Sequence, residues 1–378
     1  MITTAADDPG GAAAHDALCA RLRGEDVPIS PGMTATARCH RIHLVLATTV
    51  KPSELESTAV GALVAELRQA AVVDLVRERA LQGIVDGFAR AGVDALLLKG
   101  AGLAYLVYPS AYLRPRSDID VMVARAALER AESTLAARGW MRPAEPDGEL
   151  ITGQRHYLLA GRTALAEHLD LHWKIANPQL FADAVAFEEL LARAVPVAAL
   201  GPSARTLSIP DALFVACLHR VAHHQDVIDL LWLWDIHLLA SRLSVEQRVQ
   251  FVGLAVRASM RAVCARGLQL ASARFRTVGA TALIAALQPP RGEPPEPSTR
   301  FLGGDLRQVD LLQTDLLTLR GWRARLALVG QHLFPSRAYM QSAYPRCPTA
   351  VLPLAYLHRI LRGAPKWFRR PPPGSGPA

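Results

Sequence analysis

The chain has 378 residues, of which 51% are hydrophobic, and its 42 Lys and Arg exceed its 34 Asp and Glu to give a formal net charge of +8. This length exceeds one typical domain and predicts two. No run of about 18 consecutive apolar residues occurs and the N-terminus lacks a basic segment followed by an apolar one, so we expect neither a membrane span nor a signal peptide.

The cysteines and the basic residues indicate the compartment and the kinds of partner to expect. Five cysteines are scattered without a Cys-x-x-Cys pair or metal-ligand spacing, which predicts a cytoplasmic protein. Strands that combine basic and aromatic residues are not found, so we expect no nucleic-acid partner. Almost all cations are Arg, and Lys99 is therefore notable, because a compact ammonium beside Gly100 is a common phosphate ligand.

The N-terminal half predicts helices mixed with short strands. Residues 1–35 are rich in Ala, Gly, Asp and Pro and are predicted to be a disordered arm. Apolar periodicity, Pro109 and Gly139 then predict the following elements: a helix over 52–92, a strand over 93–98, a short helix over 101–108, a strand over 118–123 and a helix over 126–138. Residues 155–160 and 163–173 flank Gly161-Arg162 and predict a hairpin.

Strand signals fade after Pro178. The chain then predicts helices over 211–240 (broken near His224), 244–275, 306–332 and 351–361, a Pro-rich loop over 288–298 and a disordered tail over 366–378. We therefore expect one domain over 36–178 and a helical substrate or lid domain over 179–365.

The most informative motif is the pair Asp118 and Asp120. Residues two apart on a strand point to the same face, so both carboxylates project together while Ile119 and Val121 enter a core. Two carboxylates on one edge repel each other unless a cation lies between them, and the oxygen-binding cation of phosphate chemistry is Mg²⁺. Alone, the pair is also compatible with two solvated acids on an edge strand.

Asp170 is the natural third carboxylate. It alternates with Leu169 and Leu171 on a strand that can lie beside the strand of Asp118 and Asp120. Three carboxylates holding one or two Mg²⁺ ions can activate an attacking oxygen and stabilise a leaving pyrophosphate, and Asp170 is the best candidate to take the acceptor's proton.

The segments around these acids supply candidate phosphate ligands. Arg114, Arg116 and Ser117 precede the pair, and Gly100 at the end of the preceding strand lets a phosphate approach the backbone. Two interpretations of Lys99 remain open: a phosphate ligand, or a structural ion pair with Asp118 or Asp170. A Walker loop, a nucleophile elbow and a dinucleotide fingerprint are all missing from the sequence.

Four histidines are weaker candidates for a substrate pocket. His168 and His172 alternate with the apolar residues around Asp170, and His219 and His223 have i, i+4 spacing on a predicted helix. The His-Glu-x-x-His zinc pattern is missing, so packing within a helical bundle is the main alternative to ligand binding. Asp235 is expected to pack and to hold a neighbouring residue, and the basic residues from His358 onward form a solvated face or contact an anionic partner.

Three segments together resemble the uncharacterised nucleotidyltransferase family of the DNA polymerase β-like superfamily: Leu98–Ala101, Leu113–Asp120 and Leu169–Trp173. The likeness covers roughly residues 60–365. It implies an α+β fold, with a small mixed β-sheet core, flanking helices and a following mostly α-helical domain. It also matches Asp118, Asp120 and Asp170 to the superfamily's metal-binding carboxylates.

One position departs from the superfamily's pattern. The usual Gly-Ser or Gly-Gly of the nucleotide turn is Gly100-Ala101 here, and Lys99 is expected to replace the lost phosphate contact. The resemblance implies an NTP donor and Mg²⁺, with transfer of an NMP to a hydroxyl of a peptide, sugar or small natural product. Two alternatives stay open: phosphoryl transfer from the same NTP, and a non-catalytic nucleotide-binding or antitoxin-like protein.

Overall fold

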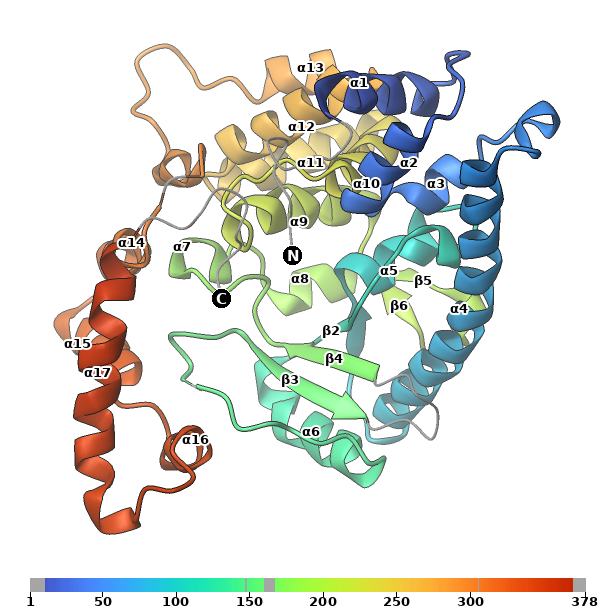
Figure 1. The fold of residues 1–378 in the computed structure, drawn as a ribbon. Coiled ribbons are helices and arrows are strands. Elements are labelled where there is room, and N and C mark those ends of the chain that lie inside the picture. Colours follow the sequence, from blue (N-terminus) through green and yellow to red (C-terminus); the bar gives the residue numbers. More distant parts are fainter. Residues whose placement is uncertain (1–10, 147, 160–166, 305, 370–378) are drawn as a thin grey trace.

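The computed structural model describes residues 11–146, 148–159, 167–304 and 306–369. Its fold is α+β, as predicted, with a six-stranded mixed sheet and helices on both faces (Figure 1). None of the described helices is long and apolar enough to cross a membrane.

The sheet has the order β3-β4-β2-β1-β6-β5. Its strands are β1 Ala95–Leu97, β2 Ile119–Val123, β3 Gln154–Leu159, β4 Glu167–His172, β5 Val195–Pro196 and β6 Arg205–Thr206. β2 and β4 are parallel neighbours, as are β1 and β6, and the remaining pairs are antiparallel. The expected hairpin partners β3 and β4 do pair, and the connection through Gly161-Arg162 lies outside the described residues.

The described helices divide in chain order into those before β4 and those after it. Those before β4 are α1 Gly11–Leu22, α2 Pro31–Cys39, α3 His43–Ala47, α4 Thr58–Arg90, α5 Lys99–Leu106 and α6 Leu128–Ala137. Those after it are α7 Gln179–Ala182, α8 Phe187–Ala192, α9 Ile209–Ala222, α10 Leu230–Ser241, α11 Val245–Arg257, α12 Arg261–Phe275, α13 Ala280–Ala286, α14 Gln308–Thr318, α15 Trp322–Leu333, α16 Arg337–Ala343 and α17 Leu352–Phe368.

Alternation along the strands divides the core in two. Leu97 and Val121 point to the face covered by α4 and α6, where they join one apolar cluster. Leu96 and Met122 point to the other face and join a larger cluster built from α1–α3, α5 and α9–α12. Figure 1 shows these two groups on opposite sides of the sheet, with α14–α17 standing out at one edge.

The prediction of a disordered arm over 1–35 is wrong for residues 11–35. Helices α1 and α2 cover most of this stretch, and Leu18 and Met33 are fully buried in the larger core. The sequence shows no lasting apolar period there, and contacts with distant residues, such as the ion pair between Arg21 and Glu54, help to hold these short helices. Residues 1–10 lie outside the described residues.

Other boundaries differ from the predicted ones at positions with special backbone conformations. The predicted break near His224 is confirmed, with Gln225 and Asp226 at positive φ between α9 and α10. The predicted helix over 244–275 is two helices that part at Ser259, and the one over 306–332 parts at Gly321. Helix α17 extends to Phe368, past the predicted start of a disordered tail at 366, and residues 370–378 lie outside the described residues.

Candidate active site

Two of the three predicted carboxylates lie side by side on neighbouring strands. β2 and β4 run parallel in a register that places Asp120 opposite Asp170 and Met122 opposite His172. Side chains of residues paired in this way point to the same face of the sheet. Asp120, Asp170 and His172 each offer a ligand atom within 4.8 Å of the others, so they form a group able to hold a metal ion.

Asp120 is buried and has two partners at one oxygen. Its Oδ1 lies 2.9 Å from Nζ of Lys99 and 2.9 Å from Nε2 of His172. Burial alone would raise the pKa of Asp120, but the charge of Lys99 and the hydrogen bond from His172 outweigh it and hold that pKa below its ordinary range. No partner of Oδ2 is found in the part of the chain that the structure describes, which leaves this oxygen for a ligand.

Lys99 is the first residue of α5 and follows β1 through a tight turn. Its φ of 42° lies in the left-handed region, which a non-glycine residue adopts only where surrounding contacts hold it. The N–H of Leu98 donates to the carbonyl of Asp120 at 3.0 Å, which ties this turn to β2. Burial opposes the charge on Lys99, but Asp120 more than compensates and raises the Lys99 pKa. Lys99 is thus an ion-pair partner of Asp120 rather than of Asp118 or Asp170.

Asp170 is oriented by the neighbouring strand β3. Nε2 of Gln154 donates to Oδ2 of Asp170 at 2.8 Å, and Nδ1 of His156 lies 2.9 Å from Oδ1. His168 contacts the far nitrogen of His156 at 3.3 Å, so this predicted pocket residue acts on Asp170 only through His156. Gln154 and His156 were missed in the sequence, although their alternation on the strand that precedes β4 is the signal that would have found them.

Asp118 lies just before β2, beside the group formed by Asp120, Asp170 and His172 but not within it. Burial and the negative charges of Asp120 and Asp170 raise its pKa. A cation bound beside these acids would therefore favour the ionised form of Asp118.

The two loop arginines predicted to bind phosphate are paired with acids instead. Arg114 makes a bidentate contact with Asp235 of α10, at 2.7 Å for its shortest bond, and Tyr108 donates to the same carboxylate. Arg116 pairs with Asp74 of α4. These contacts fix the loop before β2, so both arginines act as supports, and the predicted role of Asp235 as an anchor agrees with its contacts. Ser117 is exposed, with its hydroxyl 3.4 Å from Asp118.

The turn at Gly100 and Ala101 is tightly packed against neighbouring residues. A side chain at Gly100 would lie 2.6 Å from Nη1 of Arg114, so the glycine makes room for that guanidinium. Ala101 is fully buried in the core beside β1, which explains an apolar residue there. The first N–H groups of a helix have no intrahelical partner, and those of α5 therefore remain suited to an anion.

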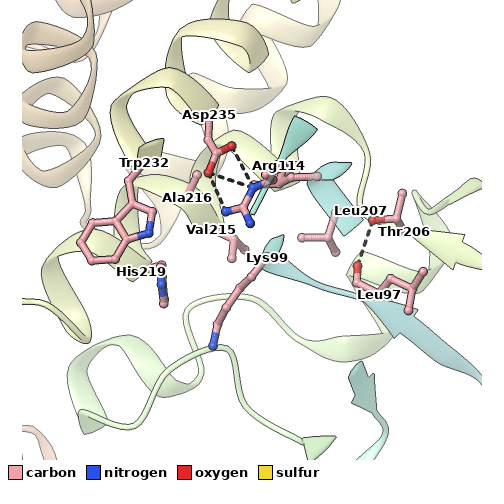
Figure 2. A pocket seen from close by; sticks show the side chains of 12 residues that line it. Leu97, Lys99, Arg114, Thr206, Leu207, Val215, Ala216, His219, Trp232 and Asp235 are labelled. Carbon is pink, nitrogen blue, oxygen red and sulfur yellow. Dashed lines mark hydrogen bonds and ion pairs between the residues drawn. The ribbon is translucent and has the colours of Figure 1, made fainter. Parts of the chain in front are cut away.

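A narrow cavity lies behind Lys99, between α5, α9 and α10. Its volume of about 20 Å³ has room for about one water molecule, so it is not the nucleotide pocket. In Figure 2 the Lys99 side chain extends away from the Arg114–Asp235 pair, and His219 and Trp232 line the other side.

Three histidines at the C-terminal end of α9 form a compact aromatic cluster, one in the last turn of the helix and two directly after it. His219, His223 and His224 lie together, and His224 stacks on Trp232 with ring centroids 4.2 Å apart. Burial and the nearby Lys99 hold the pKa values of His219 and His223 well below the ordinary range, so these side chains are neutral at pH 7. One buried ring nitrogen of each has no hydrogen-bond partner among the described residues, whereas the Nε2 atoms of His219 and His224 lie 3.2 Å apart.

A larger cavity of 250 Å³ lies between α9, the loop after β4 and the C-terminal helices. Its polar lining includes Asn177, His223 and Asp315, and its aromatic lining includes Trp367. Asn177 follows His172 by five residues, and the pKa of His223 responds to His172 and Asp120. The cavity thus lies along the segment that follows β4, the strand that carries Asp170.

Residues 31–276 match the model of a family described as an uncharacterised nucleotidyltransferase. The chain belongs to this nucleotidyltransferase family. Among curated proteins, none matches it. The matched range contains the whole described sheet, α5, all three predicted carboxylates and the histidines at the end of α9, whereas α13–α17 lie beyond it. Membership supports a transferase activity with an NTP and a divalent metal ion, and the Asp-Asp-His group is compatible with both.

Proposed function

We propose that this member of the nucleotidyltransferase family transfers an NMP from an NTP to a hydroxyl of a small natural product, sugar or peptide, with Mg²⁺ as cofactor. The observation that carries the proposal is the pairing of Asp120 with Asp170 across two parallel strands, with Oδ2 of Asp120 left for a ligand. Such a pair on a folded sheet is prepared for a cation before any ligand arrives.

Asp118, Asp120 and Asp170 would hold the metal. Oxygen ligands suit Mg²⁺, so we assign His172 to orienting Asp120, with which it shares a 2.9 Å contact, rather than to the ion. When bound, the metal supplies charge neutralisation at the transferred phosphoryl group. Lys99 keeps Asp120 ionised and presents further N–H donors to a phosphate oxygen, beside the N–H groups that begin α5.

Asp170 is assigned the role of general base. The acceptor oxygen attacks the α-phosphorus, the bond to the β-phosphate oxygen breaks, pyrophosphate leaves, and the hydroxyl proton passes to Asp170. Both Asp170 oxygens already accept one hydrogen bond, yet an ionised carboxylate has about four acceptor positions, so capacity remains. The 250 Å³ cavity beside His223 is the proposed entry for the acceptor.

The test follows the fate of each phosphorus. The protein is incubated with Mg²⁺, a pool of polyols, sugars and peptides, and ATP labelled at either the α- or the γ-phosphorus. We expect α-label in a product and release of pyrophosphate. Asp120→Asn and Asp170→Asn should each reduce the rate by about a thousandfold, since metal activation is worth several kcal/mol. Asp86→Asn, which removes an exposed carboxylate of α4, is the matched control. Transfer of γ-label instead would replace the proposal with phosphoryl transfer.

A second candidate function is nucleotide binding without turnover. The observation that favours it is Ala101, whose buried methyl group leaves the turn without the hydroxyl that the superfamily usually places on a phosphate. A melt with Mg²⁺ and each NTP tests this, because ligand at 100 times its dissociation constant stabilises the folded state by roughly 2.7 kcal/mol. A shift lost in Asp118→Asn/Asp120→Asn, with no labelled product from any pool, would support binding alone.

A further inference from the structure

The positive charge of the chain is concentrated at its C-terminal end. The 63 residues after Asp315 contain ten Lys or Arg and no Asp or Glu, whereas the 315 residues up to that point contain 32 Lys or Arg and 34 Asp or Glu. The formal charge of +8 is therefore a property of the region that contains α15–α17. This region lies outside the matched family range, and of its residues His332 and Trp367 line the cavity proposed for the acceptor.

Helix α17 carries an exposed apolar stripe within this basic region. Leu354, Leu357, Leu361 and Phe368 are each more than half exposed. Their spacings of three, four and seven residues place them on one face of the helix. Soluble helices normally bury such a face, so this stripe needs a covering partner.

A basic stripe runs along the same helix next to the apolar one. His358, Arg362, Lys366 and Arg369 are exposed, and their spacings of four, four and three residues again define one face. None of these four has an ion-pair partner in the described part of the chain. The apolar and the basic side chains thus face solvent together.

The opposite face of α17 is packed, so the orientation of the helix is fixed. Leu352 and Ala355 join Met340 of α16 in a small separate core. Further along, Ile360 and Trp367 line an apolar cavity of 370 Å³ shared with α14 and α15. Figure 1 shows α15–α17 at the outer edge of the molecule, away from the sheet.

Other exposed apolar side chains extend the surface. Trp322 and Leu326 of α15 and Phe334 after it are each more than 60% exposed. Phe368 belongs to the stripe and also lines the 370 Å³ cavity, so the apolar surface continues from the stripe into this cavity. Trp, Phe and Leu beside Arg and Lys are the side chains of helices that lie at a membrane interface.

The apolar and basic stripes of α17 distinguish three possible partners: a second copy of the chain, a nucleic acid and a lipid bilayer. A second copy docking through the same patch would bring cations against cations, because the region has no acid to pair with them. A nucleic acid would neutralise the arginines but leave the aliphatic stripe in water. A bilayer with anionic headgroups satisfies both stripes at once.

We propose that α17 docks this protein on the surface of anionic lipid membranes. The helix lies in the interfacial plane, with Leu354, Leu357, Leu361 and Phe368 among the acyl chains and Arg362, Lys366 and Arg369 at the headgroups. This is peripheral attachment and needs no spanning helix.

Vesicle flotation with the full chain tests the proposal. Vesicles of phosphatidylcholine alone are compared with vesicles of phosphatidylcholine mixed with phosphatidylglycerol, at low and at physiological salt. We expect binding to the anionic vesicles that weakens as salt rises, and little binding to the neutral ones. Each cation near an anionic surface strengthens binding about fivefold, so Arg362→Gln/Lys366→Gln/Arg369→Gln should weaken it by about a hundredfold.

Matched variants distinguish binding through α17 from nonspecific binding through other exposed apolar or basic side chains. Leu354→Ser/Leu357→Ser/Leu361→Ser should weaken flotation by at least about tenfold. Val245→Ser/Val249→Ser/Val256→Ser removes three exposed apolar side chains of α11, and Arg68→Gln/Arg90→Gln/Arg130→Gln removes three exposed cations elsewhere. Both control sets should bind like the wild type, and unchanged melting of every variant shows that each is folded.

Three outcomes would overturn the proposal. One is no flotation with anionic vesicles at low salt. Another is equal loss of flotation in the α17 variants and the control variants. The third is self-association, or binding of a DNA duplex, that depends on α17 while vesicle binding does not. None of these readouts involves NTP turnover, so a failed nucleotidyl-transfer assay leaves the membrane proposal standing, and the reverse holds as well.

Discussion

At the scale of single residues, Asp120 joins Lys99 to His172 within the candidate site. One of its oxygens accepts contacts from both, and the other has no partner among the described residues. Replacing Lys99 should therefore affect metal and nucleotide in opposite directions, because its charge competes with a cation and attracts a phosphate.

We predict that Lys99→Met tightens Mg²⁺ binding and weakens NTP binding, each by about tenfold, or roughly 1.4 kcal/mol. Calorimetric titration of Mg²⁺ alone and of NTP with Mg²⁺ measures both. Lys99→Arg keeps the charge and should change the Mg²⁺ affinity little, and Lys51→Met, which removes an exposed ammonium paired with Asp26, is the control. An unchanged NTP affinity in Lys99→Met would identify Lys99 as a structural partner of Asp120 only.

The raised pKa of Asp118 gives a pH dependence to metal binding. Burial, Asp120 and Asp170 favour the protonated form of this acid, so a proton competes with the metal above the ordinary carboxyl range. We expect the melting shift caused by Mg²⁺ to grow as the pH rises from about 4 to about 7, where Asp carboxylates lose their protons. Asp118→Asn should flatten this rise, and a profile identical to wild type would remove Asp118 from the metal site.

At the scale of elements, local sequence patterns correctly predicted the strands and helix ends that depend on nearby residues. Apolar alternation around Asp120 and Asp170 gave the two strands that meet in the sheet, and Gly139 marked the end of α6, where its φ is 86°. The sequence could not predict the partners of Arg114 and Arg116, because Asp235 and Asp74 lie 121 and 42 residues away from them in the chain. Both arginines were assigned to phosphate for that reason.

The same limit explains the elements that were missed. β5 and β6 have two residues each, too few to show alternation, and they exist because β6 pairs with β1. α1 and α2 are stabilised by burial of Leu18 and Met33 in a core formed largely by α9–α12. Sequence periodicity indicates which face of a helix is apolar, but it does not identify the distant residues that pack against that face.

Helix α5 packs closely on the sheet at Gly102, whereas Gly61 of α4 faces open space, so alanine should have opposite effects at the two positions. A Cβ at Gly102 would lie 2.4 Å from Oγ1 of Thr206 and 2.7 Å from the carbonyl of Leu97, and the backbone atom cannot move aside. We predict that Gly102→Ala destabilises the fold by about 1–3 kcal/mol, the usual cost of overpacking.

The control for that variant is Gly61→Ala in α4, where nothing lies within 4 Å of an added Cβ. This change should stabilise by about 0.5–1 kcal/mol, since alanine is the better helix former. Urea unfolding of both variants measures the two free energies. Equal effects would mean that α5 does not contact β1 and β6 as closely as the structure shows.

At the scale of the whole molecule, two backbone N–H groups near the sheet donate to side chains of the C-terminal helices. The backbone N–H of Gln179 donates to Oδ1 of Asp315 at 2.7 Å, and the N–H of Leu150 donates to Gln331 at 3.0 Å. Asp315 lines the 250 Å³ cavity proposed for the acceptor. Its protonation is coupled to the stability of the fold.

This coupling has a definite sign. Burial raises the pKa of Asp315 to about 6, although the Gln179 N–H and Lys174 both act to lower it. A carboxyl with a raised pKa binds more protons when folded than when unfolded, so stability falls as the pH rises from the ordinary Asp value of about 3.9 through 6. Other lining groups, His223 and His332, have lowered pKa values because burial disfavours their charged forms.

We predict that Asp315→Asn removes this loss of stability. Asn keeps a carbonyl oxygen for the Gln179 N–H and carries no charge, so wild type should lose about 1–2 kcal/mol between pH 4 and pH 7 that the variant retains. Urea unfolding across that range gives the difference. Asp183→Asn, at an exposed carboxylate beside Lys174, controls for the general effect of removing an acid. Parallel profiles for wild type and Asp315→Asn would show that the protonation of Asp315 does not set the pH dependence of stability over this range.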